Sequence, residues 1–333
     1  VKGVRSEGFI PSGKELGLNY DHTTVYTLDR KVKTGSLLTD VLDLDDQILE
    51  IKNKSLTHRP DTFGLYGVAR EIAAIQGTKL KRIDWFDDPN ILKPSGLKDE
   101  MKLQIVDNSK GLCKKYVAIV IRDIEVKDSP LWLQVELSKM GIHPVKNIVD
   151  VSNYLMILIG QPSHAFDYDV VVQNDPKFKG TAVLTVRRSK KGEKVTTLEG
   201  QEREMDNEML VIADSTNPIA VAGVMGGKAT EISRSTKNII YQVENLDMYS
   251  IRRSSMKLGL FTDAVTRFSK GIDPNMCESV MYRALNMMTE FSGGSLASKL
   301  IDIYPNQERK KKNLRKYLNI KLNPLIKHDK LRV

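Results

Sequence analysis

The chain has 333 residues, of which 41% are hydrophobic, and a formal net charge of +9. This length and composition predict a globular protein of more than one domain, and no run of about 18 apolar residues indicates a membrane span. The first residues contain no apolar signal segment, and the two cysteines, Cys113 and Cys277, have neither metal-ligand nor redox spacing. We therefore expect a cytoplasmic protein with reduced thiols, no metal site and no membrane contact.

The positive charge is concentrated at the carboxyl-terminal end. Residues 306–333 contain ten Lys or Arg and two acidic residues, so this segment carries +8 of the net +9. A uniformly basic surface is therefore excluded. The basic segment is either a solvated linker or a contact for a nucleic-acid backbone. Because the first residue is not Met and the last residues lack a helix stop signal, we expect both ends to be cuts through a larger protein.

The first hundred residues predict little regular structure. Residues 1–38 suggest strand and turn, and residues 47–53 (QILEIKN) predict a short strand. Residues 63–77 predict a helix that ends at Gly77 in the left-handed conformation. Residues 84–100 are rich in Pro, Asp and Gly and predict a linker. The apolar side chains that share one face of the helix are Leu65, Val68, Ala69, Ile72 and Ile75.

The remainder predicts an α+β unit. Residues 113–126 alternate as a strand does, and residues 129–141 predict a helix with Ser129 as its N-cap, Pro130 as the first helical residue and Gly141 after its end. Short strands separated by turns at 190–193 and 199–201 predict mostly antiparallel sheet. These strands are expected within residues 181–189, 193–200, 209–215, 218–227 and 238–245.

A last helix is expected to begin near Asp273, with Asp273 as its cap and Pro274 at its start. Its methionines lie at helical spacing among other apolar residues, which indicates a buried stripe rather than a set of ligands. The stripe consists of Met276, Val280, Ala284, Met287 and Phe291.

No P-loop, GxGxxG, HExxH or GxSxG pattern occurs, so the sequence does not support nucleotide hydrolysis or zinc proteolysis. The paired glycines of VMGGKAT (224–230) indicate either a tight turn or the close approach of a ligand to backbone N–H groups. Three polar stretches, at 147–166, 222–245 and 259–274, could meet on one sheet. They offer His164, Gly226, Gln242, Glu244, Thr262 and Asp263, but their spacing does not show that they converge. A lone loop histidine such as His164 is more often structural.

Five motifs occur in a characteristic order: RPDTFGLYGVAREIAA, NIVDVSNYLMILIGQPSHAFD, AGVMGG, IRRSSMKLGLFTDAVTRFSKGIDP and SGG. Together they resemble the beta subunit of bacterial phenylalanyl-tRNA synthetase over nearly the whole chain. The resemblance implies a multidomain α+β protein of mostly antiparallel sheets with flanking helices. Its parts would be the end of an OB-type tRNA-binding domain (1–38), the second half of the N-terminal domain with a linker (39–90), a B3/B4-type editing domain (91–305) and a basic segment leading into the next domain (306–333).

The resemblance also implies a division of labour between two subunits. In that family the alpha subunit uses ATP and Mg²⁺ to charge tRNA(Phe), two copies of each subunit assemble, and the beta subunit's editing domain hydrolyses Tyr-tRNA(Phe) made in error. This chain would then hold no cofactor of its own. An apolar synthetic pocket discriminates poorly against one added hydroxyl, whereas a second site that hydrogen-bonds the hydroxyl discriminates well.

Residue by residue, the resemblance assigns the family's editing roles to the matching positions. His164, in the family's Gln-Pro-x-His-Ala-Phe stretch, and Thr262, in its Gly-Leu-x-Thr-Asp-Ala stretch, would be the catalytic residues. Gly226, the first glycine of the Gly-Gly pair, and Ala264 would line the pocket.

Two positions depart from the family pattern. His143 stands where the family has arginine, and Gln242 stands where it has the glutamate that recognises the tyrosine hydroxyl. Both changes remove a charged hydrogen-bonding group, so we expect weakened editing. Glu244 lies two residues after Gln242 and would point to the same face of a strand, so it could substitute in the pocket. The alternative is a scaffold and tRNA-contact module without editing activity, whereas a free-standing deacylase is disfavoured by the OB-like start and the basic end.

Overall fold

The structure is a computed structural model that describes residues 8–19, 21–28, 32–81, 83, 97, 100–174 and 180–305. The basic segment 306–333 and nearly all of the predicted linker 84–100 therefore lie outside the described residues. In the part of the chain that is described, no helix combines the length and the apolar character needed to cross a membrane.

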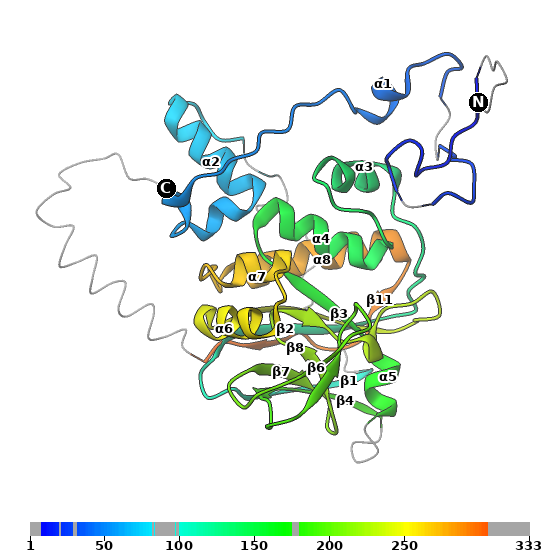
Figure 1. The fold of residues 1–333 in the computed structure, drawn as a ribbon. Coiled ribbons are helices and arrows are strands. Elements are labelled where there is room, and N and C mark those ends of the chain that lie inside the picture. Colours follow the sequence, from blue (N-terminus) through cyan, green and yellow to red (C-terminus); the bar gives the residue numbers. More distant parts are fainter. Residues whose placement is uncertain are drawn as a thin grey trace, which may run out of the picture.

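Two sheets form the centre of the α+β unit, with helices on their flanks (Figure 1). In the first sheet the strand order is β1-β4-β7-β8-β9, and only the β1–β4 pair is parallel. Its strands are β1 (Lys102–Asn108), β4 (Thr181–Arg188), β7 (Leu210–Ala213), β8 (Pro218–Val221) and β9 (Met225–Gly226). The predicted fold class, mostly antiparallel sheets with flanking helices, is confirmed.

The second sheet is antiparallel in the order β11-β2-β10-β3, and β12 also pairs with β2. A separate hairpin joins β5 (Lys194–Thr196) to β6 (Glu202–Glu204). The strands of the second sheet are β2 (Cys113–Arg122), β3 (Ser163–Asp167), β10 (Ile239–Leu246), β11 (Ser295–Leu296) and β12 (Ile301–Ile303).

Helices cover the second sheet on one face, and the first sheet covers the other. Helices α4 and α8 contact each other and share an apolar core with β2 and β10. The helices of the unit are α3 (Leu131–Lys139), α4 (Asn147–Ile159), α5 (Tyr168–Gln173), α6 (Met248–Leu258), α7 (Asp263–Phe268) and α8 (Met276–Ser292). A short helix, η4 (Lys228–Thr230), follows β9.

Strand β10 is buried along its whole length, and its side chains alternate between two apolar cores. Tyr241 and Val243 belong to the core beneath α4 and α8, while Ile240 belongs to the core shared with the first sheet. Because side chains alternate along a strand, Gln242 and Glu244 point to the same side as Ile240. Two polar side chains are thus placed within an otherwise apolar layer.

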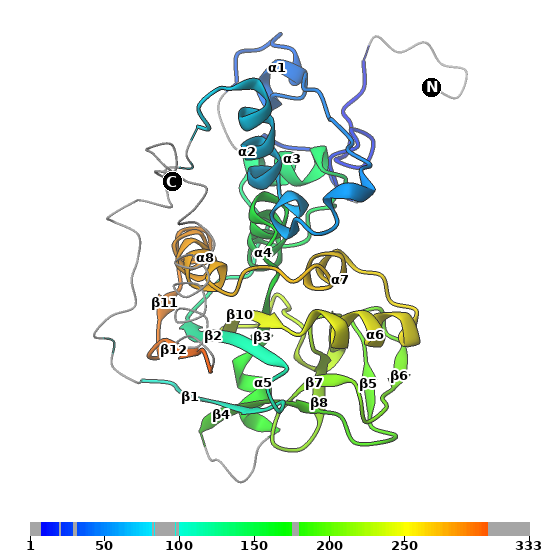
Figure 2. The same ribbon diagram turned by 90° about the vertical axis from the view of Figure 1, so that its left-hand side faces the viewer.

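The amino-terminal part contains α1 (Leu38–Leu42), η1 (Lys54–Leu56), η2 (Pro60–Phe63) and α2 (Leu65–Gln76). Arg267 Nε of α7 donates a hydrogen bond to Phe63 O at 3.1 Å, and a Cβ added at Gly64 would lie 2.5 Å from Gly160 N. The turn between η2 and α2 therefore packs directly against the end of α4, and a side chain at residue 64 has no room there. Figure 2 shows α2 and α4 close together.

Two predictions for this amino-terminal part are wrong. Residues 47–53 form no strand; their apolar side chains Ile48 and Leu49 are exposed, and no strand among the described residues pairs with them. The predicted apolar face of α2 is not its packed face, because Leu65 and Ile75 are exposed while Gly67 is buried. The predicted end at Gly77 is confirmed by its φ of 65°.

Three local details also differ from the sequence-based expectation. Ser129 does not cap α3: its hydroxyl donates to Asp150 Oδ2 at 2.5 Å, and Pro130 precedes the first helical residue. Residues 190–193 do not close a hairpin, because β4 pairs with β1 and β7 whereas β5 pairs with β6. Asn275, rather than Asp273, immediately precedes α8, although the Asp273 side chain accepts a hydrogen bond from Asn275 N at 2.9 Å.

The methionine stripe of α8 is part of the core, as predicted. Val280, Ala284 and Met287 are fully buried, and Met276 and Phe291 pack against the same cluster. The strand predicted at 113–126 is present as β2 but ends earlier, at Arg122, and the strands predicted at 181–189, 193–200, 209–215 and 238–245 correspond to β4, β5, β7 and β10. The single strand predicted at 218–227 is wrong: the chain turns at Gly223, whose φ is 66°, and β8 pairs with β9 as a hairpin.

Candidate functional site

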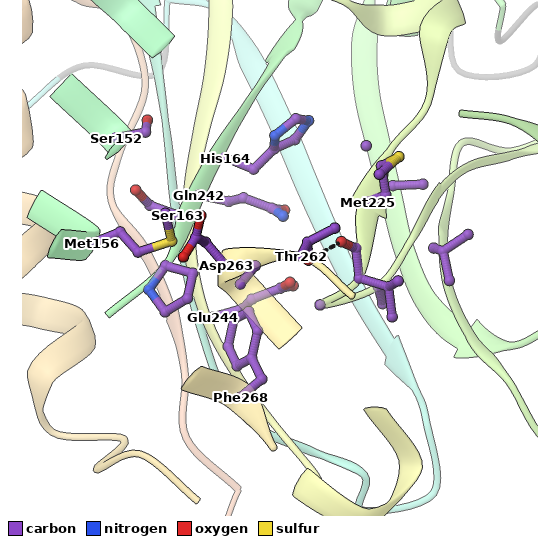
Figure 3. Close-up of a pocket in the computed structure, with 18 of the residues that line it drawn as sticks. Ser152, Met156, Ser163, His164, Met225, Gln242, Glu244, Thr262, Asp263 and Phe268 are labelled. Carbon is purple, nitrogen blue, oxygen red and sulfur yellow. Dashed lines mark hydrogen bonds between the residues drawn. The ribbon is translucent and has the colours of Figure 1, made fainter. Parts of the chain in front are cut away.

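A cavity of about 350 Å³ lies where β3, β10, the β8–β9 turn and the start of α7 meet (Figure 3). Its size is at the lower end of the range for small-molecule pockets, which suits a ligand as small as one amino acid. Seven residues that the sequence singled out line this cavity: His164, Gly226, Gln242, Glu244, Thr262, Asp263 and Ala264. Most of the remaining lining is apolar.

His164 lies directly opposite Gln242 in the antiparallel pairing of β3 and β10. Its ring packs edge-on against Phe166, with ring centroids 4.7 Å apart. A Cβ added at Gly226 would lie 2.6 Å from His164 Cε1 and 2.8 Å from Nε2, so the glycine is what makes room for the imidazole. Desolvation lowers the pKa of His164 from 6.5 to about 4, so the ring is neutral at pH 7.

Gln242 is held from behind by Tyr116, a fully buried residue of β2 that the sequence analysis missed. The Tyr116 hydroxyl donates a hydrogen bond to Gln242 Oε1. Burial raises the pKa of Tyr116 well above its usual range, so the phenol keeps the proton that it donates. The carbonyl of Gln242 is thus already engaged, and within the described residues its amide nitrogen has no hydrogen-bond partner, which leaves a donor for a ligand.

Glu244 lies next to Gln242 on the cavity side of β10 and is only 5% exposed. Among the described residues its Oε2 has no hydrogen-bond partner. Burial raises the pKa of Glu244 from 4.5 to about 8, and a hydrogen bond from the backbone of Gly223 opposes this shift only in part. The carboxyl group is therefore mostly protonated at pH 7, so it can both donate and accept a hydrogen bond.

Thr262 lines the cavity as the N-cap of α7. Its hydroxyl donates to Val224 O at 2.9 Å and accepts from Val265 N at 3.2 Å. This joins the β8–β9 turn to the start of α7 and fixes the position of Ala264, two residues on. Because the hydroxyl proton already has an acceptor, Thr262 is well placed to hold the cavity wall.

His143 is not among the residues that line the cavity. It is exposed, and the cavity is lined instead by its neighbour Ile142. The two residues precede α4 on an exposed loop, so sequence proximity to the site does not bring the His143 imidazole into it.

In the described part of the chain, no group of three or more His, Cys, Asp and Glu side chains is arranged to hold a metal ion. The polar groups described above, a neutral imidazole, a neutral carboxyl group and an amide, can form hydrogen bonds to a ligand beside apolar walls.

Comparison with known proteins identifies the class. Residues 112–293, more than half of the chain, match the family model of the B3/4 domain, and the chain belongs to that family. All the cavity residues described above lie within this range.

The particular relatives are beta subunits of phenylalanine-tRNA ligase. The chain is 34% identical over 355 residues to the one from Clostridium acetobutylicum, a match that covers 100% of this chain and 43% of that protein. It is 39% identical over 311 residues to the one from Carboxydothermus hydrogenoformans, covering 92% and 37%. The resemblance predicted from the five motifs is thereby confirmed, and the chain spans less than half the length of these relatives.

Among solved structures, an N-terminal fragment of the phenylalanyl-tRNA synthetase beta subunit from Pyrococcus horikoshii is similar at 16% identity. That match covers 74% of this chain and 63% of the fragment, with a TM-score of 0.35.

We expect Glu244 to make the folded protein less stable as the pH rises. The carboxyl group has a pKa of about 8 when folded and an ordinary value of 4.5, so between these values the folded state holds a proton that the unfolded chain has released, and stability falls. His164, lowered from 6.5 to about 4, has the opposite effect at lower pH, where stability rises with pH. The His164 effect fades as the pH rises above 6.5, and comparison of the parent with a Glu244 variant removes it because His164 is present in both.

Denaturant unfolding at pH 6.5 and 7.5 measures this effect. Between these two values the free energy of unfolding should fall by about 1 kcal/mol more for the parent protein than for Glu244→Gln. Glu202→Gln, a change at an exposed glutamate of β6, serves as the control and should follow the parent. Identical pH dependence of the parent and Glu244→Gln would show that the carboxyl group is ionised in the folded protein.

Proposed function

We propose that this chain is the part of a phenylalanine-tRNA ligase beta subunit that hydrolyses tyrosine wrongly attached to tRNA(Phe). The observation that carries the proposal is the unpartnered Glu244 Oε2 in a mostly apolar cavity with room for an amino acid. A buried polar atom without a partner costs free energy, and a ligand hydroxyl at this place would remove that cost. The names of the relatives and the match to the B3/4 family support the same function.

The proposal explains how such a site tells tyrosine from phenylalanine. The two amino acids differ by one hydroxyl group. Tyrosine would bond Glu244, which is neutral, and the free amide nitrogen of Gln242. Phenylalanine would leave both groups buried and unpaired, which is the type of arrangement that gives strong rejection. Correctly charged tRNA would thus be spared.

The proposed reaction takes place at the His164 end of the cavity. The tyrosine ring would occupy the apolar part beside Phe268, and the ester bond would lie near His164 and Gly226. With a pKa of about 4 the imidazole is a weak general base, so its proposed role is to orient the attacking water or the ester by hydrogen bonding. Holding the ester and water together in attack geometry can itself supply a large acceleration.

The partners and cofactors of the whole enzyme belong to the same proposal. An alpha subunit would make Phe-tRNA(Phe) with ATP and Mg²⁺, two copies of each subunit would assemble, and this chain would need no cofactor for hydrolysis. The cytoplasm, where translation takes place, would be the site of action.

A scaffold without editing activity is the second candidate. Two observations favour it: the low basicity of His164 and the engagement of the Thr262 hydroxyl as a helix cap. The presence of Gln242 where the family has glutamate also favours the scaffold. The experiments below separate the two candidates.

Glu244→Ala should lower kcat/KM for hydrolysis of Tyr-tRNA(Phe) roughly tenfold, because a hydrogen bond worth about 1–1.5 kcal/mol is lost. The assay follows release of labelled tyrosine by the full-length subunit assembled with its alpha partner. Glu202→Ala is the matched control, since it removes an exposed carboxyl group from the β5–β6 hairpin, and it should leave the rate unchanged.

Gln242→Glu adds a discriminating measurement. If the site were degenerate through loss of the family's glutamate, this change would raise the rate. We expect no increase, because Tyr116 holds the position of the side-chain oxygen and a second carboxyl group would crowd Glu244. If the parent protein does not hydrolyse Tyr-tRNA(Phe), the scaffold is favoured. If Glu244→Ala hydrolyses it at the parent rate, Glu244 does not have its proposed role.

Gly226→Ala should lower the hydrolysis rate at least tenfold. The added Cβ would lie 2.6 Å from His164 Cε1, which is too close, so the His164 ring must move. Gly8→Ala is the control, since a Cβ there meets nothing within 4 Å. A variant that keeps full activity would show that the position of the imidazole does not matter for the reaction. Circular dichroism and thermal unfolding of both variants establish that the fold is retained.

A further inference from the structure

An aromatic side chain is presented to solvent immediately beside the cavity. Phe261, in the short connection between α6 and α7, is 78% exposed. Its two neighbours are firmly held: Leu260 is buried, and the Thr262 hydroxyl bonds Val224 O. The backbone at Phe261 is therefore fixed, and the exposed ring is positioned by the fold. A fixed, exposed aromatic ring is a typical surface for stacking a nucleic-acid base.

A second cavity, of about 450 Å³, adjoins this ring. Its lining combines Phe261 and Met256 with two cationic side chains, Arg252 and Lys270, and with the hydroxyl residue Thr266. Aromatic faces bind bases, cations bind phosphates, and hydroxyl groups bind either phosphate or ribose. This combination is the chemistry that recognises a single-stranded nucleotide.

The charges around the second cavity favour an anion. Arg252 and Arg253 are exposed on α6 and, within the described residues, have no acidic partner. Lys270 Nζ lies 5.3 Å from the centre of the Phe63 ring, and among the described residues it forms no ion pair with a carboxylate. The nearby acid Asp263 is paired with Arg267 at 3.1 Å. The local field is thus positive at the ring that would stack a base.

The two cavities lie on either side of the first turn of α7. Thr262 and Ala264 line the first cavity, while Phe261 and Val265 line the second. A nucleotide stacked on Phe261 would therefore lie beside Thr262, which is part of the wall of the first cavity. The terminal nucleotide of a charged tRNA is likewise directly attached to its amino acid, so the two parts of the substrate would occupy neighbouring cavities.

We propose that Phe261, with Arg252 and Lys270, binds the unpaired 3′-terminal nucleotides of the tRNA and directs the esterified amino acid into the cavity beside His164. This inference rests on the proposed function and identifies the surface that would hold the nucleic-acid part of the substrate. Phe261 acts as a positioning residue, because its contact is with the nucleotide and its effect on the ester is through placement.

The first test is binding of a short, fluorescently labelled single-stranded RNA ending in CCA-3′, measured by anisotropy with the full-length subunit. Phe261→Ala should weaken binding by roughly 5- to 150-fold, the range expected for loss of one stacked base. Phe261→Trp should retain binding. Tyr249→Ala is the control, because Tyr249 is also an exposed aromatic residue of this region but does not line the second cavity.

The second test separates placement from chemistry. Phe261→Ala should lower kcat/KM for Tyr-tRNA(Phe) by a similar factor while leaving hydrolysis of tyrosine methyl ester, which has no nucleotide, at the parent rate. If the parent protein hydrolyses neither substrate, yet its RNA binding depends on Phe261, the proposed function fails and the RNA subsite stands. Equal RNA binding by the parent and Phe261→Ala, or equal loss in Phe261→Trp, would overturn the inference.

Discussion

The site depends on one constraint: β10 is buried on both faces, and it carries Gln242 and Glu244 into the apolar layer that it shares with the first sheet. Its pairing with β2 and β3 satisfies the backbone, but Gln242 and Glu244 must find partners among side chains. Gln242 finds the hydroxyl of Tyr116. Glu244 finds no side-chain partner in the described residues and holds its proton instead, because an isolated buried charge would cost far more than a neutral carboxyl group.

The rest of the unit is arranged to keep that cavity open and its walls fixed. Gly226 leaves room for the His164 ring, and Thr262 ties the β8–β9 turn to α7. Arg267, buried in α7, then bonds Phe63 O, so the amino-terminal turn before α2 is connected to the same helix. A short α7 thus links the cavity wall, the exposed Phe261 and the η2–α2 region.

Local patterns predicted the elements whose packing is regular. The alternation in β2 and the methionine stripe of α8 gave correct assignments because these elements are buried in the same way along their length. The strand expected at 47–53 failed because β pattern alone provides no pairing partner. Ser129 was misassigned as a cap because its hydroxyl bonds Asp150, a contact that its local sequence does not encode.

The composition of the site could be predicted only in part. Spacing did not show that His164, Gln242 and Thr262 converge; the resemblance to a family implied it, and the structure brings them into one cavity. The same reasoning included His143, which lies outside, and it overlooked Tyr116, whose contact with Gln242 spans 126 positions of sequence. That tyrosine lies in an apolar strand and looks like an ordinary core residue. The exposure of Phe261 likewise depends on how its neighbours are held.

The most direct test of the account is a crystal structure of the protein with a tyrosyl-adenosine analogue in which an amide replaces the ester. The account predicts that the tyrosine ring enters the cavity and that its phenol oxygen lies within hydrogen-bonding distance of the Glu244 carboxyl group. A complex in which the ring occupies the cavity with its hydroxyl directed away from Glu244, or in which the analogue binds elsewhere, would contradict it.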